Sequence, residues 1–295
     1  MRKLIFYIVD VFAEKTYLGN QVAVFRFAET LDRKEMQEIA REINFSETTF
    51  VLSDEQRDGA YDVRIFTPQT EVSFAGHPTL GTAYITRKEI VKEPINEIVL
   101  NLKAGRIPVK FDTNKKDRDV LWMRQLEPVF GDTYDSSLLS KVLSLTTKEI
   151  DNRFPIQQIS TGLPTVIVPL NTLKAVKKAK IVNSKYYEFT ENIEAKTILI
   201  FCPQTYDKAK DLNVRFFAGR YGIPEDPATG SANGCLAGYL VKHRYFDKEI
   251  IDLRVEQGIE IGIPSLLLPK AEKNGNEIIV HVGGKVKTVA KGEFV

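Results

Sequence analysis

Short apolar runs dominate the hydrophobic pattern of the chain, which is typical of β-strands. Each run is rich in β-branched or aromatic residues and is bounded by Gly, Pro, Asn or Asp. The strands predicted in this way are Phe6–Val11, Val22–Phe25, Thr49–Leu52, Tyr61–Phe66, Glu97–Leu102, Ile107–Phe111, Leu121–Arg124, Ile156–Ser160, Thr165–Pro169, Thr197–Phe201, Asn213–Phe217, Ile251–Glu256 and Ile278–Val282.

Helical periodicity is clearest over Arg33–Ile43. Met36, Ile39 and Ala40 fall on one face of that segment, and Asp32 is placed to cap its first turn. The same reasoning predicts further helices at Asp135–Leu145, Leu173–Ile181 and Lys185–Asn192.

Two other helices differ because they are rich in small residues and apolar around most of their circumference. They are Pro78–Arg87 and Ala232–His243. A helix that is apolar on all sides is normally buried. Many strands and two buried helices predict an α+β fold of two pseudo-symmetric lobes, each a β-barrel-like sheet wrapped around a central helix.

An internal repeat supports this organisation. Val63-Arg64-Ile65-Phe66 matches Val214-Arg215-Phe216-Phe217, and the glycine turns at Gly76 and Gly230 follow in the same order. Looser matches join Thr49–Leu52 to Thr165–Val168 and Gly105 to Gly258, and the approximate alignment sets Leu163 opposite Glu47. The predicted lobes are residues 1–118 and 119–279, with the tail from about 280 to 295 packing back on the first lobe.

Composition narrows the partners that the protein can have. Hydrophobic residues make up 43% of the chain and charged residues 27%, which is ordinary for a globular protein. The net charge of +2 gives no broad field for nucleic acid or a membrane surface. No apolar run is long enough to span a membrane. Two cysteines, Cys202 and Cys235, are too few for a disulfide scaffold and favour a reducing compartment, so we expect a cytoplasmic protein.

Candidate chemistry begins at the two glycine turns. Each precedes a buried helix, and the first amides of a helix attract anions. His77 and Ser231 occupy the same position of the repeat. A single turn of this kind would only mark the start of a helix, but two matched turns favour a site for a carboxylate substrate. The residues expected to bind that substrate are Gly76, Pro78, Thr79, Gly230, Ser231 and Ala232.

Two acidic residues are candidates for proton transfer. Glu47 lies between a helix end and a strand start, where apolar surroundings would suit it as an acid or base. Taken alone, Glu47 is typical of a solvated loop acid, and Asp226 before Pro227 is typical of a turn residue. The three histidines are far apart in sequence, so no metal site is predicted.

These segments together resemble the PhzF family, the phenazine-biosynthesis isomerases of the diaminopimelate-epimerase-like fold. The matching motifs are Asp10-Val11-Phe12, Gly19-Asn20-Gln21-Val22-Ala23-Val24, Ser46-Glu47-Thr48-Thr49-Phe50, Phe66-Thr67-Pro68, Phe74-Ala75-Gly76-His77-Pro78-Thr79-Leu80-Gly81, Gly162-Leu163-Pro164, Glu225-Asp226-Pro227-Ala228-Thr229-Gly230-Ser231-Ala232-Asn233-Gly234 and Glu256-Gln257-Gly258. They run in order across almost the whole chain.

The resemblance implies two lobes with the active site between them, a homodimer and no cofactor. It implies that Glu47 shuttles a proton between carbons of the substrate, assisted by His77, Asp226 and Ser231. The expected function is therefore a cofactor-independent isomerase acting on a small carboxylate. The alternatives are an amino-acid or hydroxy-acid epimerase or racemase, and a non-catalytic dimeric ligand-binding protein.

Two features limit how far the resemblance reaches. Related epimerases use one cysteine per lobe, and those places correspond here to Ala75 and Thr229, so a two-thiol mechanism is not expected. The chain also has Gln21 where the family commonly has Pro, and Ile263 where it commonly has Arg. These departures leave the substrate open.

Overall fold

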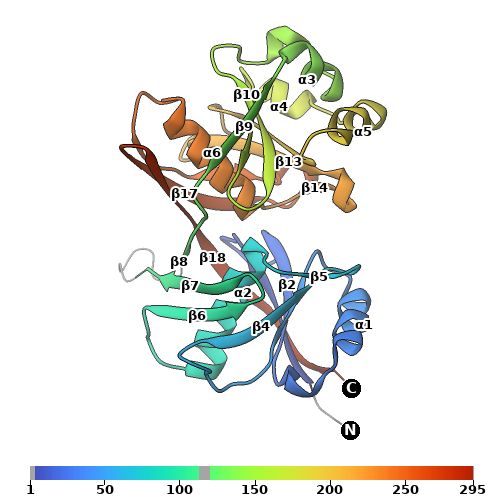
Figure 1. Ribbon diagram of the computed structural model, residues 1–295, viewed down its shortest axis with the longest axis vertical. Helices are drawn as coiled ribbons and strands as arrows, with labels where there is room; N and C mark the ends of the chain where they lie inside the picture. Colours follow the sequence, from blue (N-terminus) through green and yellow to red (C-terminus); the bar gives the residue numbers. More distant parts are fainter. Residues whose placement is uncertain (1–3, 113–119, 295) are drawn as a thin grey trace. The chain divides into compact units, whose positions relative to one another are not determined.

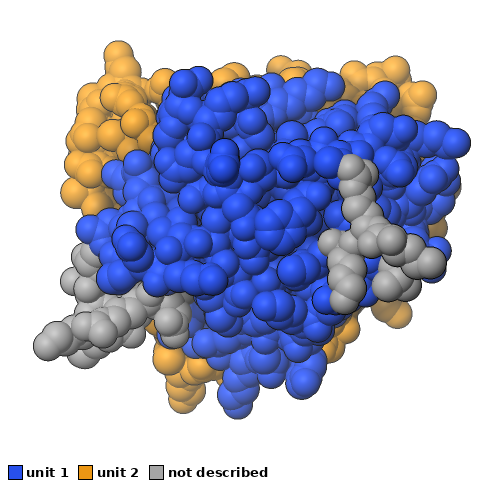
Figure 2. Space-filling model, turned by 90° about the horizontal axis from the view of Figure 1, so that it is seen from below, with its two compact units in different colours: residues 1–123, 283–295 blue, residues 124–282 orange. Residues whose placement is uncertain are grey.

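The structure is a computed structural model that describes residues 4–112 and 120–294. The chain divides into two compact units, residues 1–123 with 283–295 and residues 124–282, which Figure 2 colours separately. The predicted bounds were 1–118 and 119–279 with a returning tail. In the structure, the last strand, β18 (Glu277–Phe294), pairs antiparallel with the first, β1 (Leu4–Val11).

Unit 1 is a ring of strands around one helix. The strands of the ring are β18, β1, β2 (Asn20–Phe25), β3 (Thr48–Val51), β4 (Tyr61–Phe66), β6 (Glu97–Leu102), β7 (Gly105–Phe111) and β8 (Val120–Arg124), which pairs back to β18. The short strand β5 (Glu71–Val72) pairs with one end of β4. Helix α2 (Gly76–Ile85) packs against β1, β2 and β3 inside the ring, and α1 (Arg33–Ile43) packs on β3 and β4 (Figure 1).

Glycine allows α2 to lie this close to the strands. A Cβ atom on Gly81 would come within 2.6 Å of Val22 Cγ1 and 3.0 Å of Val9 Cγ2. Every residue of α2 from His77 to Ala83 is buried. The prediction of a buried central helix is therefore confirmed for unit 1, and its small residues are explained by this close approach.

Unit 2 repeats the plan with additions. Its strands are β9 (Val129–Tyr134), β10 (Ile156–Ser160), β11 (Pro164–Pro169), β12 (Thr197–Cys202), β13 (Leu212–Ala218), β14 (Ile223–Asp226), β15 (Ile250–Asp252), β16 (Val255–Gln257) and β17 (Ser265–Asn274). Its helices are α3 (Ser136–Val142), α4 (Leu173–Lys178), α5 (Asn183–Glu191) and the buried α6 (Gly230–Lys242), which packs against β10, β11 and β17.

The pairing pattern confirms the duplication, strand by strand. In unit 1, β1–β2 is antiparallel, β2–β3 parallel, β3–β4 antiparallel and β4–β6 parallel. In unit 2, β10–β11, β11–β12, β12–β13 and β13–β16 follow with the same directions. Both α2 and α6 follow the short strand that pairs with the end of β4 or β13.

The pairing registers of the strands correct two of the matches between the two halves of the repeat. Phe50 pairs with Arg64 and Ile200 with Arg215, so β3 corresponds to β12, and Thr49–Leu52 does not correspond to Thr165–Val168. By the same count, the residue equivalent to Glu47 is Thr197 rather than Leu163. The sequence match failed because short strands rich in β-branched residues resemble one another whatever their partners.

The second correction concerns Gly105 and Gly258, which lie in the connections from β6 to β7 and from β16 to β17. Asp62 pairs with Asn101 and Asn213 with Glu256, so Leu102 is equivalent to Gln257 and Gly105 is not equivalent to Gly258. Unit 1 turns from β6 to β7 through residues 103–104, whereas unit 2 uses residues 258–264 between β16 and β17. An insertion in this loop of unit 2 causes the mismatch.

Candidate active site

Glu47 lies in the short connection between helix α1 and strand β3. Helix α1 begins with a capping box between Asp32 and Glu35, and its C-cap is Asn44, which is left-handed with φ of 56°. That residue turns the chain toward β3, whose four side chains are all buried. The Glu47 side chain is 18% exposed, so its carboxylate stands at the boundary between the core of unit 1 and its surface.

His77 lies in the first turn of α2 and faces Glu47. Its Nε2 atom is 3.2 Å from the carbonyl oxygen of Gln21 on β2 and 3.4 Å from Oε2 of Glu47. A carbonyl oxygen can only accept a hydrogen bond, so Nε2 carries the proton in this arrangement. The structure thus brings together two residues that the sequence separates by a strand, a hairpin and a helix start.

The imidazole is neutral at physiological pH. Burial lowers the pKa of His77 to about 4, and the hydrogen bond to Gln21 opposes this only in part. Nε2 has one proton, which it donates to Gln21, so its approach to Oε2 of Glu47 is a close polar contact of a neutral ring and not an ion pair. The carboxylate of Glu47 thus stands beside a neutral imidazole that the Gln21 carbonyl holds in place.

The neutral state of His77 makes stability depend on pH. The unfolded chain takes up the proton near pH 6.5 and the folded chain only near pH 4, so stability is full above 6.5 and is lost as the pH falls. Between pH 7.5 and pH 5 we expect the wild type to lose about 2 kcal/mol more unfolding free energy than His77→Asn. Urea unfolding of both proteins at both pH values measures the difference, and equal losses contradict it.

The departure at Gln21 leaves this arrangement intact. The contact with His77 uses the backbone carbonyl, and the Gln21 side chain is exposed. A proline, which retains its carbonyl oxygen, could make the same contact. Ile263, the other departure, lies in the loop between β16 and β17 of unit 2 and is 36% exposed.

Asp226 is held at the corresponding helix start of unit 2. It is the last residue of β14, is 6% exposed, and accepts a hydrogen bond from the hydroxyl of Thr229, the N-cap of α6. Gln257 on β16 donates from Nε2 to the Asp226 carbonyl at 2.9 Å and to the Thr229 hydroxyl at 3.2 Å. Its Oε1 atom accepts from Asn233 Nδ2 at 2.9 Å. The loop that carries Asp226 is therefore fixed by a buried network.

Sequence reasoning missed the roles of Thr229, Asn233 and Gln257. The segment Glu256-Gln257-Gly258 matched the family, but nothing in its spacing shows which residue its amide will bind. The repeat could have supplied a signal. Gln257, which is fully buried, stands where unit 1 has the apolar Leu102. A buried amide at a position that is apolar in the other copy indicates a local polar function.

The two units carry their acids at different positions of the repeat. Ile65 pairs with Val72 and Phe216 with Asp226, so Asp226 has the apolar counterpart Val72. Glu47, in turn, has the counterpart Thr197. At these two positions of the repeat, each unit therefore has an acidic residue where the other has none.

The predicted substrate-binding residues lie at the two helix starts. Gly76 and Ser231 are half-buried, while Pro78, Thr79, Gly230 and Ala232 are buried. Thr79 is already engaged, because its hydroxyl donates to the Ala75 carbonyl at 2.6 Å and its N–H donates there at 3.3 Å. The amides of Gly76, His77 and Ser231 precede the first intrahelical bonds and suit an anion. Substrate binding by this set stays a prediction.

Neither thiol fits a two-cysteine mechanism. Ala75 and Thr229, which the resemblance aligns with the thiols of the epimerases, are the N-caps of α2 and α6. Cys202 and Cys235 are buried and unlinked, and burial raises the pKa of each thiol to about 11.

Over residues 4–112 and 120–294, no cluster of His, Cys, Asp and Glu could hold a metal ion. In the same ranges, no helix is long and apolar enough to cross a membrane.

This mixed α+β fold, with two repeated units each built around a buried helix, is found in solved proteins. A PhzF-family phenazine biosynthesis protein from Bacillus anthracis superposes with a TM-score of 0.91 at 29% identity, over 100% of both chains. A hydroxyproline epimerase from Agrobacterium vitis has a TM-score of 0.66 at 10% identity, covering 100% of this chain and 91% of its own. The second likeness concerns the fold alone.

The sequence comparisons give the family. Residues 9–292 match the PhzC-PhzF family of phenazine biosynthesis-like proteins. The trans-2,3-dihydro-3-hydroxyanthranilate isomerase of Pseudomonas aeruginosa is 33% identical over 97% of both chains. The uncharacterized isomerase CA_C3446 of Clostridium acetobutylicum is 31% identical over 100% of this chain and 99% of its own. The chain therefore belongs to the phenazine biosynthesis-like family and is an isomerase, which confirms the resemblance seen in the sequence.

Proposed function

We propose that this isomerase moves a proton between two carbons of a small carboxylate, using Glu47 as the acid and base and no cofactor. The observation that supports the proposal is the pair formed by Glu47 and His77. A carboxylate at the edge of an apolar core, 3.4 Å from Nε2 of a neutral imidazole, is placed to take a proton from a bound substrate and return it.

Glu47 is the only base in the proposed reaction. Glu47 removes a proton from a carbon of the substrate, and the C–H electrons form a new double bond. The existing double bond shifts, and its far carbon takes the proton back from Glu47. His77, which is held by the Gln21 carbonyl, packs beside Glu47 and positions it, while Asp226 and Ser231 bind polar groups of the substrate. The free amides at the start of α2, beside His77, bind the substrate carboxylate.

The substrate class follows from the relatives. Several curated relatives carry the name trans-2,3-dihydro-3-hydroxyanthranilate isomerase, at 33% identity. We propose that compound, or another unsaturated carboxylate with an acidic C–H, as the substrate.

We also propose a cytoplasmic homodimer. Sedimentation measures the mass of the particle, and a monomer at micromolar concentration would remove the dimer from the proposal.

Proton NMR of trans-2,3-dihydro-3-hydroxyanthranilate and a panel of amino and hydroxy acids tests the proposal. We expect the double bond of an unsaturated carboxylate to migrate. Deuterium exchange at a stereocentre without bond migration would instead show the epimerase or racemase. Binding of panel members without exchange or turnover would show a ligand-binding protein.

A further inference from the structure

Gln257, on the short strand β16, uses its whole amide on the segment that carries Asp226. Its Nε2 atom donates to the Asp226 carbonyl at 2.9 Å and to the Thr229 hydroxyl at 3.2 Å. Its Oε1 atom accepts from Asn233 Nδ2 at 2.9 Å and from the Thr229 N–H at 3.4 Å. A glutamine amide has two donor and two acceptor positions, so all four are occupied. The side chain is fully buried, and the loss of any of these partners would leave a buried polar group unsatisfied.

The hydrogen bonds of this network run in one direction, toward the Asp226 carboxylate. Nε2 of Gln257 can only donate, so the Thr229 hydroxyl oxygen accepts from it. The single proton of that hydroxyl is then directed to Oδ2 of Asp226. A hydroxyl that donates to a carboxylate makes a charge-assisted hydrogen bond, which is stronger than a neutral one. Gln257 therefore sets the orientation of the hydroxyl that holds Asp226.

The two neighbours of Gln257 in the chain fix its position. Glu256 accepts a hydrogen bond from the Tyr206 N–H at 2.6 Å, which ties β16 to the loop between β12 and β13. Gly258 is left-handed with φ of 78°, and a Cβ atom on it would lie 2.6 Å from the carbonyl oxygen of Pro227. Only glycine allows the two chain segments to approach this closely.

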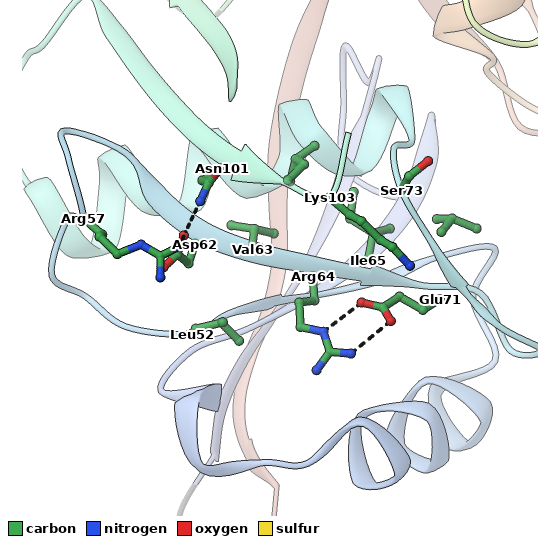
Figure 3. A pocket seen from close by; sticks show the side chains of 12 residues that line it. Leu52, Arg57, Asp62, Val63, Arg64, Ile65, Glu71, Ser73, Asn101 and Lys103 are labelled. Carbon is green, nitrogen blue, oxygen red and sulfur yellow. Dashed lines mark hydrogen bonds and ion pairs between the residues drawn. The ribbon is translucent and has the colours of Figure 1, made fainter. Parts of the chain in front are cut away.

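The repeat shows that this network is not needed to build a unit. Three of its residues have counterparts in unit 1 that carry no polar side-chain atom. These pairs are Asp226 with Val72, Thr229 with Ala75 and Gln257 with Leu102. Val72 and Leu102 line the open groove of unit 1 that Figure 3 shows. Unit 1 thus forms the same strands and the same buried helix without the network.

A neighbouring contact, in contrast, is present in both units. Arg64 donates two hydrogen bonds to Glu71 in unit 1, at 2.8 and 3.0 Å (Figure 3). Arg215 donates two to Glu225 in unit 2, at 2.8 and 2.7 Å. Glu225 comes directly before Asp226, so adjacent residues of β14 differ in kind. The ion pair recurs with the fold, whereas the network occurs only in the unit with an acid at position 226, which indicates that it serves the site.

We propose that Gln257 is a positioning residue of the isomerase, which acts through the Thr229 hydroxyl to hold the Asp226 carboxylate in the orientation that binds substrate. The inference rests on the proposed role of Asp226 in substrate binding. Gln257 contacts no reacting atom. Its loss therefore weakens a binding interaction, which raises KM and leaves kcat largely unchanged.

Steady-state kinetics with trans-2,3-dihydro-3-hydroxyanthranilate test the proposal. Thr229→Val removes the hydroxyl and keeps the shape of the side chain. We expect it to raise KM about tenfold, because one charge-assisted hydrogen bond is lost, and to keep kcat within about threefold of the wild type. Thr229→Ser retains a hydroxyl and should bring KM back to within about threefold.

Gln257→Leu, which installs the residue that unit 1 has, should also raise KM about tenfold. The double variant Thr229→Val/Gln257→Leu should raise KM about tenfold rather than about a hundredfold, because both changes act through the same hydroxyl. Additive effects, or a KM of Thr229→Ser as high as that of Thr229→Val, would overturn the proposal.

The matched control is Gln158→Leu. Gln158, on β10 of unit 2, also binds through its amide, to the Ala195 N–H at 3.0 Å and to Glu194 at 3.0 Å. Its replacement should lower the melting temperature and leave KM unchanged. If Thr229→Val and Gln257→Leu behave like this control, with a lower melting temperature and the KM of the wild type, their role is structural and the proposal is wrong.

Asp226→Asn separates the positioning role from the proposed function. A raised KM in Asp226→Asn together with wild-type KM in the other variants would overturn the positioning role alone. Wild-type KM in Asp226→Asn would remove Asp226 from the proposed function, and the positioning role with it.

The carboxyl ¹³C signal of Asp226 gives a readout that needs no turnover, and it is assigned by its absence from Asp226→Asn. We expect Thr229→Val and Gln257→Leu to shift this signal and Gln158→Leu to leave it in place. An unshifted signal in both variants would show that neither residue holds the carboxylate.

Discussion

Glu47→Gln is expected to lower the turnover number about 10²–10⁴-fold, the range for loss of a general acid–base group. The glutamine side chain would keep the shape of the glutamate and its place beside His77. Its amide cannot accept a proton from carbon. Substrate binding, measured by titration of the inactive variant, should therefore stay within a few-fold of the wild type.

The control for this variant is Glu42→Gln, at an exposed position near the end of α1. It removes the same charge from the same region of unit 1 and should leave turnover unchanged. Retention of more than about a tenth of wild-type turnover by Glu47→Gln would show that another group moves the proton, because such a group contributes at least about 10²-fold.

Arg215→Met is expected to destabilise unit 2 by about 3–5 kcal/mol, the cost of leaving a buried charge without its partner. Arg215 makes four side-chain hydrogen bonds, two to Glu225 and two to the carbonyls that end α4. All four are lost in the variant. Urea unfolding followed by circular dichroism measures the effect. The double variant Arg215→Met/Glu225→Leu should recover part of the loss, because no unpaired charge remains.

Arg64→Met is the matched comparison from the other copy of the repeat. Glu71 keeps its hydrogen bond from Arg33, and the position is more exposed, so the loss should be roughly half as large. Trp122, the only tryptophan, lies in unit 1, so its fluorescence reports that unit. A larger effect of Arg64→Met than of Arg215→Met would contradict the view that Arg215 is the more enclosed of the two arginines.

Local signals explain which elements the sequence predicted well. Helix α1 was predicted with the bounds that the structure shows because its apolar face and its capping residue lie within or beside the segment itself. The two buried helices were predicted from their composition, although each begins two residues earlier than expected, at Gly76 and Gly230. Their glycine starts were assigned to the preceding turn, since glycine is a poor helix former.

Tertiary packing explains what was missed. Strand β18 runs from Glu277 to Phe294, but only Ile278–Val282 was predicted, because Gly283 and Gly284 are typical of a break. In the structure a Cβ on Gly284 would lie 2.3 Å from the Phe12 ring, so the glycine is required by close packing. Strands β9 and β17, with their many polar residues, were missed because their pairing partners define them.

The residues of the candidate site also fall into those that a sequence motif indicates and those that only tertiary packing defines. Glu47 and His77 were found through a family motif, and without that motif Glu47 had no better assignment than a loop acid. Their contact depends on β2, β3 and α2 meeting in one barrel. The network of Thr229, Asn233 and Gln257 was missed because a buried hydrogen bond depends on which side chains the fold brings together.

The central claim is that Glu47 moves the proton without a cofactor. The most direct measurement follows deuterium by NMR during turnover of trans-2,3-dihydro-3-hydroxyanthranilate in D₂O, with protein dialysed against a chelator. We predict that protonated Glu47 exchanges its proton with D₂O before it reprotonates the substrate. The wild type then forms a product with a shifted double bond and deuterium at the receiving carbon, and Glu47→Gln incorporates none. Equal incorporation by the two proteins, or turnover that requires an added metal or cofactor, would contradict the account.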